Sequence, residues 1–260
     1  SINEEVRRRF ILQEEYLGNN KTINKIKPLV SVIVITYQHA AFIKECLEGI
    51  LIQKVDFPFE IILGEDASTD GTREICIEYA QKHQDKIRLF LRDRNLTHGK
   101  DDNGLGFNGF FAMMSGRGKY YAFCEGDDYW TDSSKLQRQV DILESHADYS
   151  LCFHNAKILF ADGSRDSQIY CPPFLNDLSV FNTNDLIKSI VRIPTNTMVF
   201  RPDWLASDVP SWYFTTRAGE KTIQLFTSLH GKIVYLDRIM SVYRLHPGSI
   251  SYNQTQKYAF

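Results

Sequence analysis

Uninterrupted apolar runs alternate with helical patterns along the first 150 residues of the chain. The runs are rich in β-branched and aromatic side chains and are short, as expected for strands buried on both faces. They are "LVSVIVIT" (29–36), "FEIILG" (59–64), "KIRLFLR" (86–92) and "YYAFC" (120–124). Helical periodicity fills the segments 40–53, 71–83 and 132–146. Strands that alternate with helices predict an α/β fold with a mainly parallel sheet flanked by helices.

The segments outside this alternation have weaker patterns. Residues 1–27 predict a charged helical extension outside the sheet, whose run Arg7–Arg9 is interpreted as a solvated face, with contact to anionic lipid as the alternative. A Gly- and Asn-rich loop is expected over Asn95–Gly106. Further on, we expect a helix capped by Thr183 or Asn184, and then a strand over 195–201 at the edge of the sheet.

Composition narrows the class of protein. A chain of 260 residues is long enough for one large domain or two small ones. The formal net charge of −2, without a dominant basic stripe, argues against nucleic acid as a partner. The five cysteines form no Cys-x-x-Cys pair, which disfavours a disulfide framework or a zinc knuckle and favours a reducing cytosol. No apolar run reaches the length of a membrane span and no signal-peptide pattern is present, so we expect a soluble, cytoplasmic protein.

Polar residues follow the predicted strands where a ligand crevice of an open α/β sheet would lie. "TYQH" follows the first strand, "GEDASTDGT" the second and "EGDDYW" the fourth. Asp70 and Thr72 are interpreted as turn and cap residues of the following helix. Two acidic strand ends that converge on one crevice repel each other, and a cation would relieve that repulsion.

The spacing of the acids after the fourth strand suggests the kind of cation. If the chain stays extended past Cys124, Glu125 and Asp127 point to one side and Asp128 to the other. Gly126 allows a close approach of the backbone or a sharp turn. Oxygen ligands of this kind suit Mg²⁺ or Mn²⁺, which also bind phosphate oxygens and water. A hard cation that carries a diphosphate is the natural interpretation.

Four motifs together resemble the family 2 glycosyltransferases, which have a GT-A (Rossmann-like) fold. They are "SVIVITYQH", "FEIILGEDASTDGT", "YYAFCEGDDYW" and "GKIVYLDRIMSVYRLH", and the resemblance runs in order from Pro28 to Ser251. It implies one catalytic domain, with a nucleotide-sugar-binding half at 28–148 and an acceptor-binding half at 149–260. It also implies an inverting, metal-dependent enzyme of the hexosyltransferase type, with UDP as the favoured nucleotide.

The resemblance further implies a partner and a location. The acceptor would be a glycan or a lipid-linked molecule of bacterial surface-polysaccharide synthesis. A cytoplasmic enzyme that uses such an acceptor would work at the inner face of the membrane, as a peripheral protein.

Carried over by position, the resemblance assigns the donor side of the site. Thr36 and Tyr37 would line the base pocket, and Asp66, next to Glu65, would hydrogen-bond the base. Glu125 would contact the ribose side. Tyr37 as a simple core aromatic is the alternative.

The same resemblance assigns the reacting end. Asp127 would bind Mn²⁺ or Mg²⁺, His246 would reach the metal or the diphosphate, and Arg244 would contact the diphosphate. Glu220 would be the general base, although an acid at a helix N-terminus is also favoured by the macrodipole alone. His246 as an ordinary loop histidine is likewise an alternative.

Other residues are candidates for contact with a sugar. Trp130 would stack on an apolar sugar face, or else be a buried anchor. The Thr195–Thr197 segment, and Thr197 in particular, would meet the donor sugar. The chain departs from the family pattern at Glu125 and Glu65, where Asp is commoner, and at Lys221, where an aromatic residue is frequent.

Two other functions stay open. A sugar nucleotidylyltransferase would use a related sheet and the same metal, but it needs a Gly-rich loop after the first strand, and "TYQHAAF" has no glycine. A non-catalytic sugar-binding relative would keep the fold and lose the base.

Overall fold

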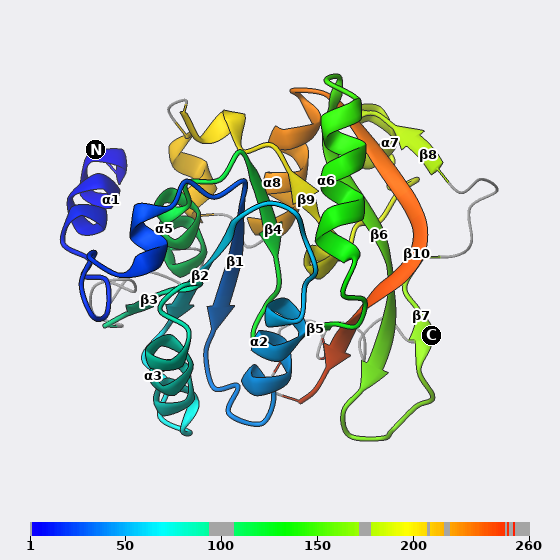
Figure 1. Ribbon diagram of the computed structural model, residues 1–260. Helices are drawn as coiled ribbons and strands as arrows, with labels where there is room; N and C mark the ends of the chain where they lie inside the picture. The colour runs from blue at the N-terminus through cyan, green and yellow to red at the C-terminus, as the bar shows by residue number, and fades with distance from the viewer. Residues whose placement is uncertain are drawn as a thin grey trace.

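The computed structural model describes residues 2–93, 107–171, 178–206, 209–215, 219–247, 249 and 252 (Figure 1). The loop predicted over Asn95–Gly106 lies outside these residues. None of the helices in the described ranges is long and apolar enough to cross a bilayer.

The first half of the chain forms the parallel part of the sheet. Its strands are β1 (Val30–Thr36), β2 (Phe59–Glu65), β3 (Ile87–Leu91) and β4 (Tyr120–Phe123). They pair in parallel in the order β3-β2-β1-β4. The helices among and after them are α2 (Ile43–Leu51), α3 (Thr72–Lys82), α5 (Phe107–Ser115) and α6 (Lys135–Ser145). The predicted α/β alternation is confirmed.

The second half continues the same sheet. Its longest strands, β6 (Tyr149–Phe160) and β10 (Lys232–Leu245), pair in parallel with register shifts. The short strands are β5 (Tyr129–Trp130), β7 (Gln168–Ile169), β8 (Leu178–Phe181) and β9 (Val199–Phe200). Beyond β4 the order is β9-β6-β10-β5, with β7 on β6 and β8 on β10. One sheet therefore runs through both predicted halves.

Two expectations for this half are wrong in detail. The strand predicted over 195–201 is a 3₁₀ turn, η2 (Thr195–Thr197), followed by β9, which lies inside the sheet between β4 and β6. The turn forms because the Thr197 hydroxyl donates to the Pro194 carbonyl at 2.7 Å. The cap of α7 (Thr183–Ile187) is Asn182, whose side chain accepts from two backbone N–H groups of the first turn.

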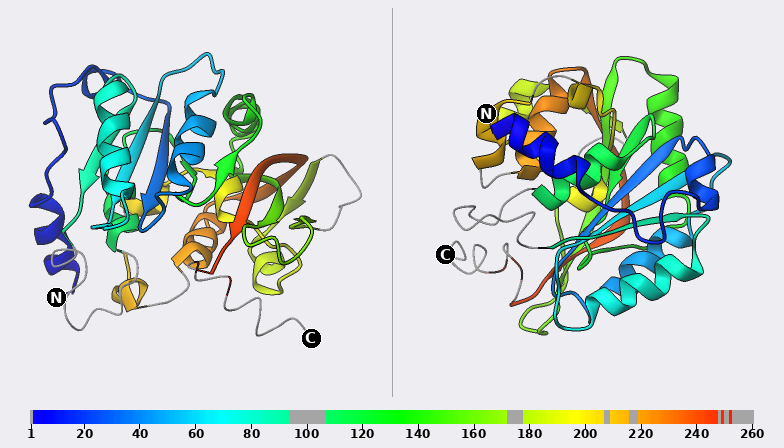
Figure 2. Two further views of the ribbon diagram at one scale, coloured as in Figure 1. Left: turned by 90° about the horizontal axis from the view of Figure 1, so that it is seen from below. Right: turned by 90° about the vertical axis from the view of Figure 1, so that its left-hand side faces the viewer.

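Helices cover both faces of the sheet (Figure 2). The side chains of Val30, Val32 and Val34 pack in a cluster with α2, α3 and α6, while Ile33 packs on the opposite face. That opposite face is covered by α1 (Ile2–Ile11), α5 and α8 (Gly219–Ser228). The remaining elements are the 3₁₀ turns η1 (Thr22–Lys25), η3 (Asp203–Ala206) and η4 (Ser211–Thr215).

The helix α1 lies outside the sheet, as predicted, and contacts the core on one side. Its Val6 is buried, and Phe10 packs edge-on against Phe111 of α5 at 5.8 Å. Arg8 and Arg9 form ion pairs with Glu5 of the same helix, which agrees with a solvated charged face.

Candidate functional site

The acidic loop between β4 and β5 turns immediately after its first residue. The backbone N–H of Asp128 donates to the Glu125 carbonyl at 2.9 Å, and that of Gly126 donates to the Ile35 carbonyl of β1 at 2.9 Å. The turn brings carboxylate oxygens of Glu125, Asp127 and Asp128 within 4.8 Å of one another. The expectation that an extended chain would point Asp128 away is therefore wrong.

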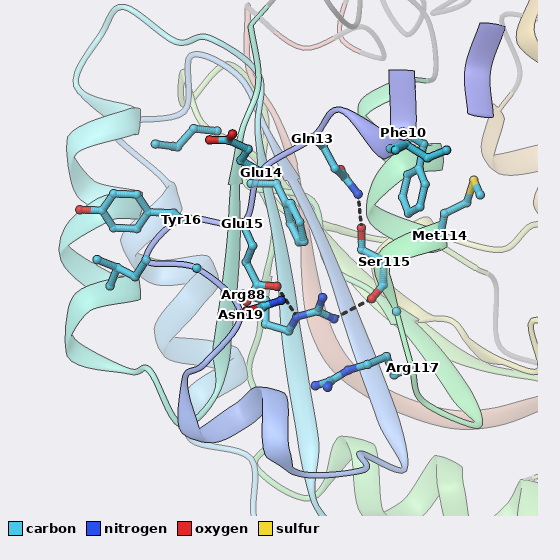
Figure 3. A pocket seen from close by; sticks show the side chains of 16 residues that line it. Phe10, Gln13, Glu14, Glu15, Tyr16, Asn19, Arg88, Met114, Ser115 and Arg117 are labelled. Atoms are coloured by element: carbon cyan, nitrogen blue, oxygen red, sulfur yellow. Dashed lines mark hydrogen bonds and ion pairs between the residues drawn. The ribbon is translucent and has the colours of Figure 1, made fainter. Parts of the chain in front are cut away.

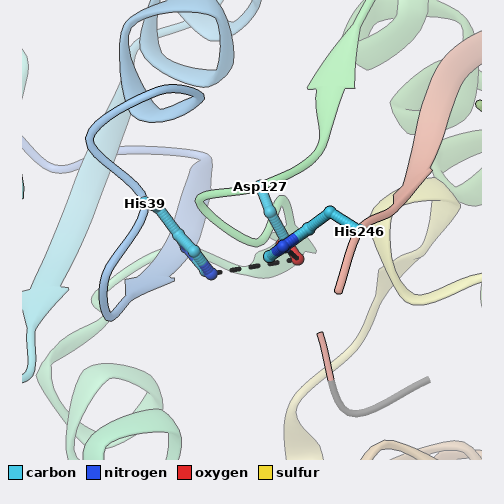
Figure 4. Close-up of side chains that lie close together, drawn as sticks. All are labelled: His39, Asp127 and His246. Atoms are coloured by element: carbon cyan, nitrogen blue, oxygen red, sulfur yellow. Dashed lines mark hydrogen bonds and ion pairs between the residues drawn. The ribbon is translucent and has the colours of Figure 1, made fainter. Parts of the chain in front are cut away.

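Two histidines face the carboxylate of Asp127 (Figure 4). The Nε2 atom of His246, at the end of β10, lies 3.2 Å from Asp127 Oδ2. The Nε2 atom of His39, in the loop after β1, lies 3.9 Å from the same oxygen. The structure thus brings Asp127 and His246 together, and their role as metal ligands stays a prediction. His39 was not predicted, although its position in "TYQH" at a strand end was the signal that would have found it.

Gly126 is required by the close approach of two loops. A Cβ atom at this position would lie 2.4 Å from Thr36 Oγ1 and 2.9 Å from His39 Nδ1. The Thr36 hydroxyl is itself 3.2 Å from His39 Nδ1 and is buried. Thr36 therefore supports His39, and its predicted contact with a base stays a prediction.

Burial and like charge set the protonation of the acidic loop. Burial, followed by the charges of Asp127 and Glu220, raises the pKa of Glu125 to about 8. Burial and the charges of Asp127 and Glu125 raise the pKa of Asp128 well above its ordinary value. Burial also acts to raise the pKa of Asp127, but the hydrogen bond with His246 and the nearby His39 lower it overall. Asp127 is thus the carboxylate of the loop that carries its negative charge most readily.

His39 is kept neutral by its surroundings. Burial lowers its pKa, against the charge of Asp127, which acts to raise it. A neutral imidazole is the form that binds a metal ion.

Arg244 braces the acidic loop from β10. Its guanidinium donates to the Asp127 carbonyl at 2.6 Å and to Glu45 Oε2 at 2.5 Å, and it lies over the rings of Phe42 and Tyr129. Its backbone N–H donates to Asp128 Oδ1 at 2.7 Å. These contacts hold the acidic loop, and the predicted contact of the guanidinium with a diphosphate stays a prediction.

The acids after β2 have different surroundings. Glu65 is fully buried, and its carboxylate accepts from Arg73 Nε at 2.5 Å and from the Ser68 N–H at 2.7 Å. It shapes the loop from within, so its predicted contact with a nucleotide is not supported. Asp66 is tied to the first loop, because its N–H donates to the Thr36 carbonyl at 3.0 Å. Tyr37 is exposed beside it.

Glu220 lies in the first turn of α8 with its side chain exposed. Its charge acts to raise the pKa of Glu125 and also that of Tyr170, whose pKa is raised mainly by burial. Glu220 therefore lies close enough to the acidic loop for its charge to affect the pKa of Glu125. Its role as a base stays a prediction.

Trp130 and Thr197 are only 2% and 0% exposed. The Trp130 indole N–H donates to the Asn196 carbonyl at 2.9 Å, and the ammonium of Lys135 lies 4.0 Å from the ring centroid. This burial does not support the predicted contact of either residue with a sugar. Trp130 is the buried anchor that the sequence had left as the alternative, and Asp70 is the predicted turn residue, accepting from Thr72 N–H and Oγ1.

A separate pocket of about 920 Å³ lies between the chain after α1, strand β3 and the end of α5 (Figure 3). Its polar side chains already contact one another: Arg88 pairs with Glu15 at 3.0 Å and donates to the Ser115 carbonyl at 2.7 Å. None of the candidate site residues described above lines it. We therefore place the candidate site at the loops after β1, β2, β4 and β10.

Comparison with known proteins gives one consistent relationship. A sequence model described as "Glycosyl transferase family 2" matches residues 31–204. An uncharacterized protein of Mycobacterium tuberculosis is 34% identical over 227 residues, which cover 85% of this chain and 60% of the relative. A putative teichuronic acid biosynthesis glycosyltransferase of Bacillus subtilis, TuaG, is 28% identical, with 88% and 83% covered. The chain thus spans about 60% of the length of the first relatives that it matches.

Two solved structures share the fold. The S. aureus TarS fragment 1–349 in complex with UDP superposes with a TM-score of 0.61 at 21% identity, with 84% of this chain and 61% of that chain covered. The mannosyltransferase PcManGT of Pyrobaculum calidifontis, in complex with GDP-Man and Mn²⁺, gives 0.61 at 15% identity, with 98% and 67% covered. At these identities the likeness establishes the fold alone.

Proposed function

Because the chain belongs to glycosyl transferase family 2, we propose that it moves a sugar from a nucleoside diphosphate donor, UDP in the first place, to a hydroxyl group of a glycan or lipid-linked acceptor. The transfer is metal-dependent and inverts the anomeric carbon. The observation that carries this proposal is the convergence of two histidines from distant loops on Asp127. The charge of Glu220 also acts on Glu125 in the same acidic loop.

The donor side rests on the loops after β1 and β2. Asp66 and the exposed Tyr37 are the residues that we propose to contact the base. Relatives support a nucleotide donor: structures of TarS contain UDP or UDP-GlcNAc, and that of PcManGT contains GDP-Man.

The residues around Asp127 fit a divalent cation. Asp127 and His246 offer an oxygen and a nitrogen 3.2 Å apart, and Mn²⁺ is present in the PcManGT complex. When bound, such an ion neutralises the charge that develops on a leaving diphosphate. Glu125 and Arg244 hold the shape of the loop around this position.

Glu220 is the proposed base for the acceptor hydroxyl. Its carboxylate is exposed at the N-terminal turn of α8, next to the positive end of the helix dipole. A single base without a protein nucleophile gives inversion, and a positioned base contributes about 10²- to 10⁴-fold to the rate.

The decisive experiment compares Glu220→Gln with Glu74→Gln. Glu74 is a matched control, because it is an exposed glutamate in the first turn of α3. Donors are first found by thermal shift with Mn²⁺, since a ligand at about 100 times its dissociation constant adds about 2.7 kcal/mol of stability. Turnover and the donor dissociation constant are then measured for each variant.

Glu220→Gln should lower kcat by about 10²-fold or more with little change in donor affinity, and Glu74→Gln should change neither. Normal turnover of Glu220→Gln would remove this residue from the mechanism. If the wild type binds nucleotide sugars but neither transfers nor hydrolyses them, the protein is a non-catalytic sugar-binding relative. Synthesis of a nucleotide sugar from a nucleoside triphosphate would instead identify a nucleotidylyltransferase.

A further inference from the structure

Asp127 belongs to two groups of side chains that could each hold an ion. One group is His39, Asp127 and His246, and the other is Glu125, Asp127 and Asp128. We propose that the first group is the metal site, that His39 is its third ligand, and that the site selects a first-row transition ion over Mg²⁺. This inference deepens the proposed function, on which it rests for the role of the metal.

The three ligand atoms converge from different loops (Figure 4). Both histidines present Nε2 to the same oxygen of Asp127, at 3.2 Å for His246 and 3.9 Å for His39. Ligands about 2.1 Å from an ion and at right angles to each other lie about 3 Å apart. His246 and Asp127 already have this separation, and His39 needs a movement of less than about 1 Å to reach it.

Neighbouring groups orient His39 as a ligand. Its Nδ1 lies 3.2 Å from the Thr36 hydroxyl. An Nδ1–H that donates to this hydroxyl leaves the lone pair on Nε2, the atom that faces Asp127. Gly126 allows the acidic loop to pack closely against Thr36 and His39, because a Cβ atom at this position would overlap both side chains.

The other two ligands are braced in the same way. The ring of His246 packs against Phe42, with centroids 4.8 Å apart. Arg244 fixes the backbone of Asp127 through its carbonyl at 2.6 Å. The three ligands are thus held by second contacts of the kind that metal sites use.

The chemistry of the ligand atoms distinguishes this group from the carboxylate group, because each group has two half-buried residues and one buried residue. The side chains of His39, Asp127 and His246 are 16%, 14% and 10% exposed, and one oxygen of Asp128 already accepts the Arg244 N–H. An ion among the histidines can therefore also bind phosphate oxygens of a donor. Two imidazoles and one carboxylate suit Mn²⁺, Fe²⁺, Co²⁺ or Zn²⁺, whereas Mg²⁺ is bound through oxygen ligands.

The test measures binding of Mn²⁺ alone, without a donor, from the loss of the free Mn²⁺ signal in electron paramagnetic resonance. Mn²⁺ is the weakest binder of the transition series, so its competition with Mg²⁺ is the most demanding comparison. The proteins are the wild type, His39→Ala, His39→Gln and the control His230→Ala. His230 is exposed at the end of α8, and its Nδ1 faces the Phe226 carbonyl. Thermal melts check that each variant is folded.

We expect both His39 variants to bind Mn²⁺ at least about tenfold more weakly than the wild type, and His230→Ala to bind it equally well. A hundredfold excess of Mg²⁺ should displace little Mn²⁺ from the wild type. Unchanged Mn²⁺ affinity in a folded His39 variant, or displacement by an equal concentration of Mg²⁺, would overturn the inference.

Failure of the proposed function gives a different result. If the His39 variants bind Mn²⁺ more weakly than the wild type, but the wild type binds no nucleotide sugar, the protein has the metal site without the transferase activity. If the wild type transfers sugar and the His39→Gln variant binds Mn²⁺ normally, the protein has the activity but His39 is not a metal ligand.

Discussion

Lys135 carries a charge in the interior of the protein, and replacing it by methionine should stabilise the fold. The side chain is fully buried, with its ammonium over the Trp130 ring and 2.9 Å from Gln139 Oε1. Across the described ranges, no carboxylate forms an ion pair with it. Methionine keeps a long unbranched chain and removes the charge.

The size of the effect follows from the protonation of the amine. Burial lowers the pKa of Lys135 from 10.5 to about 7. At 1.36 kcal/mol for each pH unit, the buried charge costs up to about 5 kcal/mol below pH 7. The substitution loses a cation–π contact of about 2 kcal/mol and leaves Gln139 short of a partner, at about 1 kcal/mol. The variant should therefore be about 2 kcal/mol more stable at pH 7.

The sign of the pH dependence is fixed by proton binding. Between pH 7 and 10.5 the unfolded chain holds a proton on Lys135 and the folded chain does not, so the wild type becomes more stable as pH rises in this window. The advantage of the variant should shrink by up to about 1.4 kcal/mol for each pH unit and be close to zero by pH 9.

Urea unfolding followed by far-ultraviolet circular dichroism at pH 7, 8 and 9 measures this difference. Lys54→Met is the matched control, because Lys54 is exposed and its replacement should give no such pH dependence. A difference between the wild type and Lys135→Met that stays constant from pH 7 to 9 would refute the reasoning. So would a variant that is clearly less stable at pH 7.

Three further predictions concern the loops of the site. Asp127→Asn should abolish the Mn²⁺-dependent part of donor binding and leave the fold intact; calorimetric titration with and without Mn²⁺ tests this, and an unchanged metal dependence would contradict it. Asp66→Ala should weaken binding of the bare nucleoside diphosphate and of the nucleotide sugar equally, because its proposed contact is with the base; an effect limited to the nucleotide sugar would argue against that contact. Gly126→Ala should destabilise the protein by about 1–3 kcal/mol in thermal or urea unfolding, because its Cβ would lie 2.4 Å from Thr36 Oγ1. Gly109→Ala, whose Cβ would meet Ile35 at an ordinary 3.8 Å, is its control and should be neutral or stabilising.

The parallel part of the fold was predictable because its signals are local. Strands such as β1 are buried on both faces, so an unbroken β-branched run is enough to identify them. Because Asp127 follows one of these strands, its position at the carboxyl edge of the sheet could be predicted without any knowledge of contacts. His246 needed the resemblance as well, because nothing in its local sequence connects it to that edge.

The sequence predictions were less successful where contacts between residues distant in the sequence determine the position of a side chain. Glu65 turns inward because Arg73 of the next helix offers an ion pair, and Trp130 is buried because β10 and the Asn196 carbonyl cover it. The two-residue strand β9 is too short to leave a pattern in the sequence. The strand-end position of His39 in "TYQH" placed it near the site, but its approach to Asp127 and His246 is visible only in the structure.

The two histidines follow the first and the last of the described strands of the sheet in the order of synthesis. His39 follows β1, whereas His246 follows β10, which pairs with β5 just after the acidic loop. Contacts this far apart in the sequence form late, since the loop that they close must be ordered first. In the proposed metal site, the three ligands therefore come together only when β10 has docked, and binding of the metal would report that this strand is in place.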